Sequence, residues 1–311
     1  MKKLTKNLLI FLSVFYLLFM TGCSLKSAPA SSNGIDKKEK SKTTQTLNKS
    51  DEKAETSKEN TNGDTKTDTN SSAESNNTTT NNPIEMKDNT ESIPVLTYHS
   101  VGNTNGNQLI ISPELLDKEM QWLKDNGYTT LTLAEAYRFF SENKPVPKKS
   151  VVLTFDDGYV DNYTHMYPIL KKYGFKATIF VITDSVDKNS AYLTSTQLKE
   201  LESNGIAIES HTVDHKKLET LSYQNQLEEM KNSKLFLEGL LKKKVDYIAY
   251  PFGTYNDATL QAAKEAGYTM ALSMDQGWSN KNNGIYKLHR VYISAFYDMN
   301  TFEKRVTNPQ Y

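Results

Sequence analysis

The chain has 311 residues, enough for one or two domains, and its 37 basic and 37 acidic residues cancel to a formal net charge of zero. This balance offers no support for a nucleic-acid partner, which would favour a basic chain. No Phe, Trp or Tyr lies between Phe19 and Tyr98, and all five histidines lie at or after His99. We therefore expect the folded part to occupy the C-terminal two thirds.

Residues 1–22 have the pattern of a signal peptide. Lysines at positions 2, 3 and 6 precede the apolar run LLIFLSVFYLLFM, which is too short for a comfortable membrane span. The run leads to TGC, and Cys23 is the only cysteine of the chain. This segment resembles a bacterial lipoprotein signal, in which the cysteine is lipidated and becomes the mature N-terminus. The resemblance implies a lipid-anchored protein on the extracytoplasmic face of the cell membrane, and the alternative is an ordinary signal peptide followed by an unmodified cysteine.

Residues 23–92 are rich in Ser, Thr, Asn, Lys and Glu and have very few apolar side chains. Such a segment cannot bury enough apolar surface to offset the entropy lost on ordering. We expect a disordered linker that tethers the rest of the chain to its anchor.

Residues 93–311 alternate between strand and helix patterns and are assigned to one domain. Predicted strands occupy 94–99, 129–133, 151–155, 177–182, 206–210, 245–250, 269–273 and 287–293. Predicted helices occupy 112–127, 134–143, 163–174, 194–205, 222–244 and 257–267. Ser112 and Pro113 are typical of a helix start, and Thr132 with Glu135 fits a capping box. Seven or eight strand–helix repeats predict an α/β fold, a parallel (β/α) barrel of about seven strands, whose chemistry would collect where strands end.

Two of these strand ends carry residues suited to a metal site. Asp156, Asp157 and Gly158 follow the strand 151–155; alone, this tripeptide would most often be a simple turn. His211 and His215 follow the strand 206–210, and two histidines four residues apart can share one face of a helical turn and bind one metal ion. One carboxylate and two imidazoles would leave coordination positions open for water and substrate, as a hydrolytic site requires.

TFDDG together with SHTVDH resembles the first two motifs of the polysaccharide deacetylases of carbohydrate esterase family 4, and the similarity extends over residues 93–311. The resemblance implies a distorted barrel with Asp156 as general base and Asp157, His211 and His215 as ligands of a divalent metal. Zinc is the expected metal, with manganese or cobalt as alternatives. The implied reaction removes acetyl groups from N-acetylglucosamine units of a polymer.

The third and fourth family motifs are altered. AYPFG has Pro251 and Phe252 in place, with Tyr250 as a supporting residue, but Ala249 stands where the family has an arginine that orients the base. The backbone amide of Phe252 remains available to stabilise an oxyanion. The fourth motif is represented only by MDQGW, and we expect Trp278, together with Tyr255 and Phe252, as aromatic residues that stack on sugar rings.

In this family the general acid is normally a histidine near the C-terminal end of the domain. His289 lies in that region, but it lacks the usual Leu-x-His spacing. Members that resemble the poly-N-acetylglucosamine deacetylases instead take the acid from a Tyr-His pair near the start of the domain, which LTYHSVG matches. His99 is therefore the candidate acid, and Arg290 is the candidate replacement for the missing arginine. His289 and His165 are expected to be structural.

Two non-catalytic alternatives remain. The altered motifs favour a carbohydrate-binding protein that has kept the barrel and lost turnover, whereas a metal site closed by a fourth protein ligand would favour a structural role in an adhesive lipoprotein. We expect a monomer that acts on poly-N-acetylglucosamine or peptidoglycan, and the early position of the acid favours the former polymer.

Overall fold

The computed structural model describes residues 83–103 and 106–311. These residues belong to one compact unit. The predicted signal peptide, Cys23 and all but the last ten residues of the predicted linker lie outside the described residues. No helix within the described ranges is long and apolar enough to cross a membrane.

Seven parallel strands form a closed barrel, which confirms the predicted fold class. Its first strand, β2, pairs with both β12 and β7, and these two pairings close the ring. The barrel strands are β2 (Val95–Tyr98), β7 (Ser150–Phe155), β8 (Ala177–Val181), β9 (Ile206–Ser210), β10 (Tyr247–Ala249), β11 (Met270–Gln276) and β12 (Leu288–Tyr292). An eighth strand, β5 (Thr129–Leu131), pairs with β7 outside the ring. Two short pairs are added, β1 (Met86–Lys87) with β6 (Val146–Pro147) and β3 (Ser100–Val101) with β4 (Ile110–Ile111).

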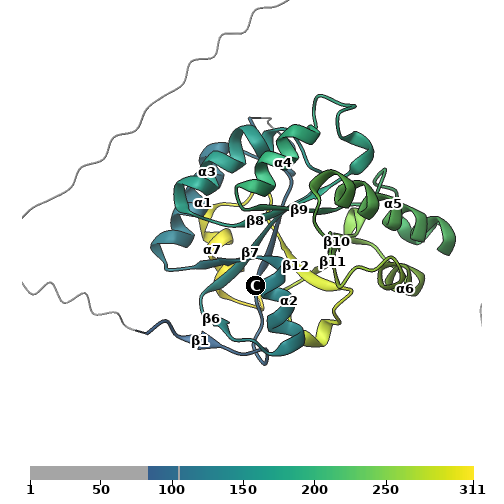
Figure 1. Cartoon of the computed structure of the whole chain (residues 1–311). Helices are drawn as coiled ribbons and strands as arrows, with labels where there is room; N and C mark the ends of the chain where they lie inside the picture. Colours follow the sequence, from purple (N-terminus) through teal and green to yellow (C-terminus); the bar gives the residue numbers. More distant parts are fainter. Residues whose placement is uncertain (1–82, 104–105) are drawn as a thin grey trace, which may run out of the picture. The chain divides into compact units, whose positions relative to one another are not determined.

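Helices surround the strands, as Figure 1 shows. They are α1 (Pro113–Asp125), α2 (Leu133–Glu142), α3 (Tyr167–Tyr173), α4 (Ser195–Ser203), α5 (Tyr223–Leu241), α6 (Asp257–Glu265) and α7 (Met299–Thr307). Ser112 caps α1 and Thr132 forms a capping box with Glu135, as predicted. One predicted helix differs, because its first turn is a π-helix, η1 (Asn162–Met166), that leads into α3. Helix α7 was not predicted.

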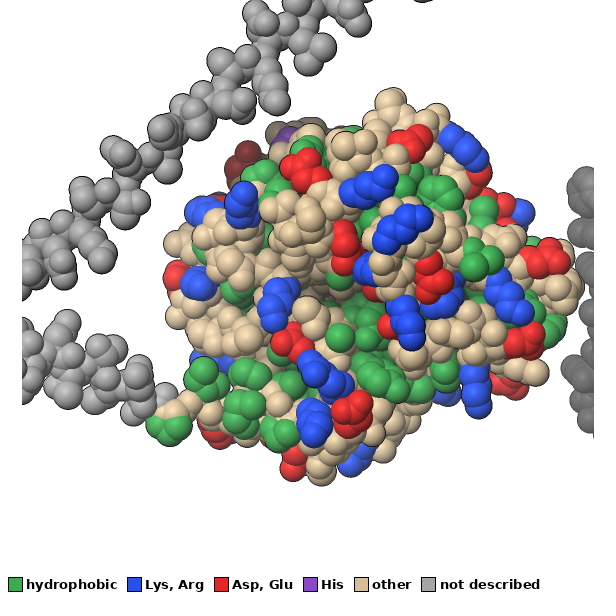
Figure 2. All heavy atoms as spheres, in the orientation of Figure 1, with side chains coloured by type: hydrophobic (Ala, Val, Ile, Leu, Met, Phe, Trp, Pro, Cys, Tyr) green, Lys and Arg blue, Asp and Glu red, His purple; other side chains and the backbone are tan. Residues whose placement is uncertain are grey.

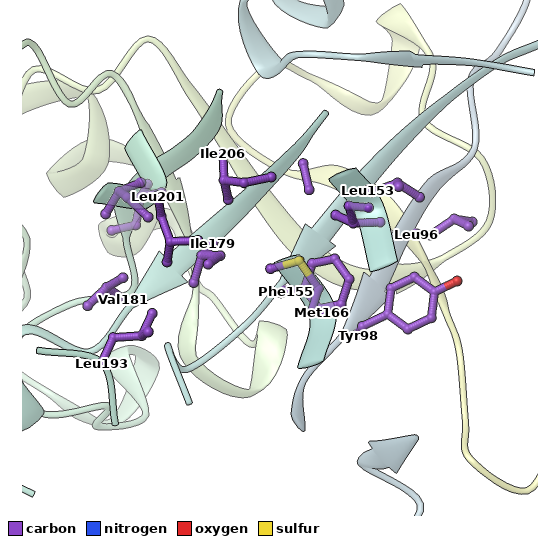
Figure 3. Close-up of a cluster of buried hydrophobic side chains, with 14 of the residues drawn as sticks. Leu96, Tyr98, Leu153, Phe155, Met166, Ile179, Val181, Leu193, Leu201 and Ile206 are labelled. Carbon is purple, nitrogen blue, oxygen red and sulfur yellow. The ribbon is translucent and has the colours of Figure 1, made fainter. Parts of the chain in front are cut away.

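Two clusters of apolar side chains hold the barrel together. Successive residues of β2 alternate between them, since Leu96 packs toward the helices and Val95 packs inside the barrel. The outer cluster joins the strands to the helices around them. Figure 3 shows part of it, including Leu153 and Phe155 of β7 and Met166 of the segment that leads into α3. The inner cluster includes buried residues of α2, so this helix covers the end at which the strands begin. The opposite end remains available for chemistry.

One face of the domain, shown in Figure 2, is mixed in charge. In Figure 2, lysine and arginine side chains alternate with acidic ones, and apolar side chains gather only locally.

A buried carboxyl group lies between the barrel and α1. Glu119 is fully buried, and its Oε2 accepts a hydrogen bond of 2.9 Å from the Tyr98 hydroxyl. Burial raises the pKa of Glu119 from its ordinary value of 4.5 to about 8, against the opposing effect of that hydrogen bond. The side chain therefore keeps its proton at neutral pH.

We expect the pH dependence of stability to reveal this proton. Because the folded-state pKa is raised, the contribution of Glu119 is fully present below about pH 4.5 and is lost as the pH rises to about 8. The slope is at most about 1.4 kcal/mol per pH unit. Glu119→Gln removes this titration, so its Tm relative to wild type should rise between about pH 5 and pH 8. Glu114→Gln, at an exposed position of the same helix, is the control, and a constant Tm difference for Glu119→Gln would contradict the prediction.

Candidate active site

The strand ends meet at one cavity of about 370 Å³, opposite the end that α2 covers. Residues that directly follow β2, β7 and β9 contribute to its wall, as the barrel predicts. The lining residues are His99, Gln108, Leu109, Asp156, Asp157, His211, His215, Phe252, Gly253, Met274, Gln276 and Tyr292. Six of the predicted site residues therefore line a single cavity.

Asp157, His211 and His215 converge as a possible metal site. One ligand atom from each lies within 4.8 Å of the others. Asp157 Oδ1 is 3.5 Å from Nε2 of His211 and 3.3 Å from Nε2 of His215. This oxygen is buried and accepts no hydrogen bond from the described residues. A buried carboxylate oxygen that faces two imidazole nitrogens fits a divalent cation, which would satisfy all three atoms.

The two histidines have the protonation state that a metal requires. His211 Nδ1 lies 2.7 Å from the carbonyl oxygen of Ala249, so Nδ1 carries the proton and Nε2 presents its lone pair to the cluster. Burial lowers the pKa of His211 to about 3 and also lowers the pKa of His215. Burial raises the pKa of Asp157 to about 6. Both imidazoles are thus neutral at neutral pH, as ligands must be.

The two histidines converge without the helical turn that their four-residue spacing would allow. Residues 211–217 form a loop that begins where β9 ends. Thr212 and His215 adopt positive φ angles of 68° and 60°, which reverse the chain and return the second imidazole to the first. A four-residue spacing suits this loop as well as a helical turn.

Backbone strain is concentrated around the cluster. Asp157 and Phe252 have φ angles of 73° and 58°, in the left-handed region that non-glycine residues seldom adopt. Gly158, with φ 79°, fits against Val181, where an added Cβ would lie 3.3 Å from a side-chain carbon. Such conformations persist when the surrounding contacts outweigh their cost, and they are common at functional sites.

Asp156 lies beside the cluster in a buried ion pair. Its Oδ1 and Oδ2 accept hydrogen bonds of 2.8 Å from the two terminal nitrogens of Arg290, in a bidentate arrangement. Burial alone would raise the pKa of Asp156, but the Arg290 guanidinium holds it well below its usual range. Arg290 is itself fixed by a hydrogen bond of 2.9 Å from Nε to the carbonyl oxygen of Ser273. The geometry is that expected of a replacement for the arginine absent at Ala249.

The three histidines outside the metal cluster differ in placement. His99 lines the cavity and is half-buried. His289 lies outside the cavity lining, with Nε2 3.1 Å from Asn283 Nδ2. His165 is exposed, and its Nδ1 lies 2.7 Å from the carbonyl oxygen of Val101. Among these three, His99 alone could reach a ligand bound in the cavity.

Only one of the three aromatic residues predicted to stack on sugars lines the cavity. Phe252 is 54% exposed, and its ring lies 4.6 Å from the His215 ring. Trp278 instead donates from Nε1 to the Arg305 carbonyl oxygen and lines a different cavity, near the residues that precede β2 and β7. Tyr255 hydrogen-bonds to Asp275. The expectation for Trp278 and Tyr255 is therefore corrected.

Tyr250 is also absent from the cavity lining. It is fully buried, and its hydroxyl donates to the Tyr286 carbonyl oxygen at 2.8 Å. Its contribution is to the packing beneath the Phe252 turn.

Sequence reasoning missed several lining residues. Tyr292 lies two positions after Arg290, on the same side of β12, so the two-residue period of a strand could have identified it. Gln108 and Leu109 belong to the loop that connects β3 to β4, and no sequence pattern in that loop predicts a role in the site.

A family model described as polysaccharide deacetylase matches residues 143–271. YxkH of Bacillus subtilis (strain 168), by its name a presumed polysaccharide deacetylase, is 44% identical over 202 residues, which are 65% of this chain and 71% of YxkH. The chain belongs to the polysaccharide deacetylase family. The matched range of this family model contains Asp156, Asp157, His211 and His215, whereas His99 and Arg290 lie outside it.

Further relatives cover most of this polysaccharide deacetylase domain. The Streptococcus pyogenes deacetylase PplD, solved in complex with acetate, is 38% identical with a TM-score of 0.67, and the match covers 70% of this chain and 98% of that one. The poly-β-1,6-N-acetyl-D-glucosamine N-deacetylase of Staphylococcus aureus (strain MSSA476) is 29% identical over 248 residues, 70% of this chain and 84% of the relative.

Proposed function

We propose that this polysaccharide deacetylase is a metal-dependent hydrolase that removes N-acetyl groups from N-acetylglucosamine units of a cell-surface polysaccharide. The observation that carries the proposal is the convergence of Asp157, His211 and His215 beside the Arg290-bound carboxylate of Asp156, in one open cavity. A cation held by three protein ligands keeps coordination positions free, which suits hydrolysis better than a structural role.

The three ligands would hold zinc, with manganese and cobalt as alternatives, since two imidazole nitrogens and one carboxylate oxygen suit all three ions. When bound, the cation would lower the pKa of a water molecule and polarise the acetamide carbonyl group. Asp156 would take the proton of the attacking water. Because Arg290 holds the pKa of Asp156 low, this carboxylate is a weak base, and it needs a water molecule that has been made acidic.

The remaining residues act on the leaving nitrogen and the developing oxyanion. His99 would give its proton to the nitrogen, because an amide nitrogen cannot depart as an amine anion. The backbone N–H of Phe252 would stabilise the oxyanion, since Phe252 lines the cavity. The products are acetate and a free glucosamine amine.

The location of the protein in the cell is also proposed, on the basis of its N-terminal sequence. We propose that residues 1–22 are a lipoprotein signal peptide, that Cys23 carries the lipid, and that residues 23–92 tether the domain 93–311 to the extracytoplasmic face of the membrane. Poly-N-acetylglucosamine is the preferred substrate for two reasons. His99 belongs to a Tyr-His pair near the start of the domain, and a relative that covers most of this domain is named for that polymer. Peptidoglycan is the alternative.

The direct test is acetate release by the purified full-length protein from poly-N-acetylglucosamine and from peptidoglycan, after chelation and after addition of zinc, manganese or cobalt. Release that chelation abolishes and metal restores supports the proposal. Equal release by the metal-free protein contradicts the metal dependence, and polymer binding without acetate release favours a non-catalytic carbohydrate-binding protein.

The role of His99 predicts a selective defect. Without a general acid, amide hydrolysis should fall about a hundredfold or more, whereas an activated acetate ester, whose leaving group needs no proton, should be cleaved nearly as before. The measurement compares His99→Ala for chitooligosaccharide deacetylation and 4-nitrophenyl acetate cleavage. His289→Ala is the matched control and should change neither rate much. If the selective amide defect follows His289 instead, His99 is not the acid, and the preference for poly-N-acetylglucosamine loses its main support.

A further inference from the structure

We infer that Asn162 is a positioning residue for the deacetylation reaction and acts by fixing the backbone at His99. The inference rests on the proposed role of His99 as the acid. Asn162 does not line the cavity, and no motif considered above includes it.

Asn162 contacts His99 through a partly buried hydrogen bond. It is fully buried, and its side-chain amide nitrogen donates to the His99 carbonyl oxygen at 2.9 Å and to Asp161 Oδ1 at 3.1 Å. Because the Asn162 side chain is fully buried, it is held in place by its surroundings, and its loss would leave the carbonyl oxygen of His99 without this partner.

This hydrogen bond belongs to a series that joins two site loops. The carbonyl oxygen of Tyr98 accepts from the backbone N–H of Asp156 at 2.9 Å. The next residue, His99, accepts from Asn162, and the residue after it, Ser100, donates its hydroxyl to Asp161. Three consecutive residues around the proposed acid are thus bonded to the segment 156–162, which also carries the proposed base and a proposed metal ligand.

The local fold explains why Asn162 can do this. It begins the π-helix η1, which is separated from the Asp156–Gly158 loop by residues 159–161, and its backbone N–H donates to the Tyr159 carbonyl oxygen at 3.0 Å. Single π-helical turns are frequent at functional sites. The consequence is that a side chain outside the cavity helps to hold His99 at its distance from the two aspartates, together with the pairing of β2 and β7.

A misplaced acid should affect only the step that needs a proton. In Asn162→Ala, kcat for chitooligosaccharide deacetylation should fall roughly tenfold to a hundredfold, the loss typical of a shift of about 1 Å, with KM nearly unchanged. Cleavage of 4-nitrophenyl acetate should stay within about twofold of wild type. In the His99→Ala background, the same substitution should lower deacetylation no further, because the group that it positions is already gone.

The experiment uses the full-length, zinc-loaded protein, and retained zinc stoichiometry shows that each variant keeps the fold. Asn89→Ala is the matched control, because Asn89 is also a buried asparagine whose amide donates to a backbone carbonyl, that of Phe140, away from the cavity. Asn162→Ser replaces Asn162→Ala if the latter does not fold, since serine is too short to reach His99.

The outcomes separate this inference from the proposed function. If His99→Ala has the selective amide defect while Asn162→Ala slows both substrates equally, or adds its full effect to His99→Ala, the positioning role is refuted and the acid assignment stands. If His99→Ala has no selective defect, the acid assignment fails and this inference fails with it.

Discussion

Replacing either His211 or His215 by alanine is expected to abolish both deacetylation and stoichiometric metal binding while leaving the barrel folded. Each substitution removes one of the three proposed protein ligands among the described residues, so the affinity for zinc should fall by more than about a hundredfold, the upper range for losing a residue that merely supports a ligand. The measurements are zinc content after dialysis, acetate release, and the Tm of the metal-free protein.

His165→Ala and His289→Ala are the controls for general effects of losing an imidazole, because both residues lie outside the cavity lining. They should keep zinc and activity. Tight zinc binding by the double variant His211→Ala, His215→Ala would show that the metal site has been assigned to the wrong residues.

The second large effect separates the two adjacent aspartates. Asp156→Asn should keep the metal and lose about a hundredfold to ten-thousandfold in turnover, since a general base is lost and no ligand is. Asp157→Asn should lose the metal. The opposite pattern, with metal lost from Asp156→Asn and kept by Asp157→Asn, would reverse the assigned roles.

The buried ion pair provides a control for stability. Asp156→Asn leaves the buried Arg290 without its counter-charge, which typically costs about 3–5 kcal/mol of folding free energy, so Tm should fall as well. The double variant Asp156→Asn, Arg290→Met removes the unpaired charge and should recover much of the Tm. Turnover should stay low in the double variant, which shows that the lost activity is not a consequence of lost stability.

The repeating fold was predictable because its strands are continuous apolar runs with clear boundaries. Strand β9 has the predicted bounds, since Gly205 precedes it and the polar loop of His211 follows it. Helix α7 was missed, although Asp298 caps it and Phe302 and Val306, four residues apart, are its buried residues. This pattern of a cap and two apolar residues is short. No strand follows it in the sequence, so the repeat of strand and helix gave no reason to expect a helix there.

The site was predictable in its residue types and less so in its geometry. Asp156, Asp157, His211 and His215 follow strands, and a parallel barrel must bring such residues together. The positive φ angles at Thr212 and His215 depend on the surrounding packing, so the residue types there did not indicate the path of the loop. Trp278 matched a motif, yet its side chain packs near α7, because placement depends on the path of the chain between β11 and β12.

The closure of the barrel through β2 has a consequence for the order of folding. The cavity is lined by His99, which follows the first barrel strand, and by Tyr292, which belongs to the last one together with Arg290, the partner of Asp156. Contacts between such distant parts of a sequence form late, because a long loop must close before they gain any stabilisation. Recovery of activity after refolding should therefore follow the slowest phase in which native structure forms. During synthesis, which proceeds from the N-terminus, the domain would remain inactive until its last strand has been made.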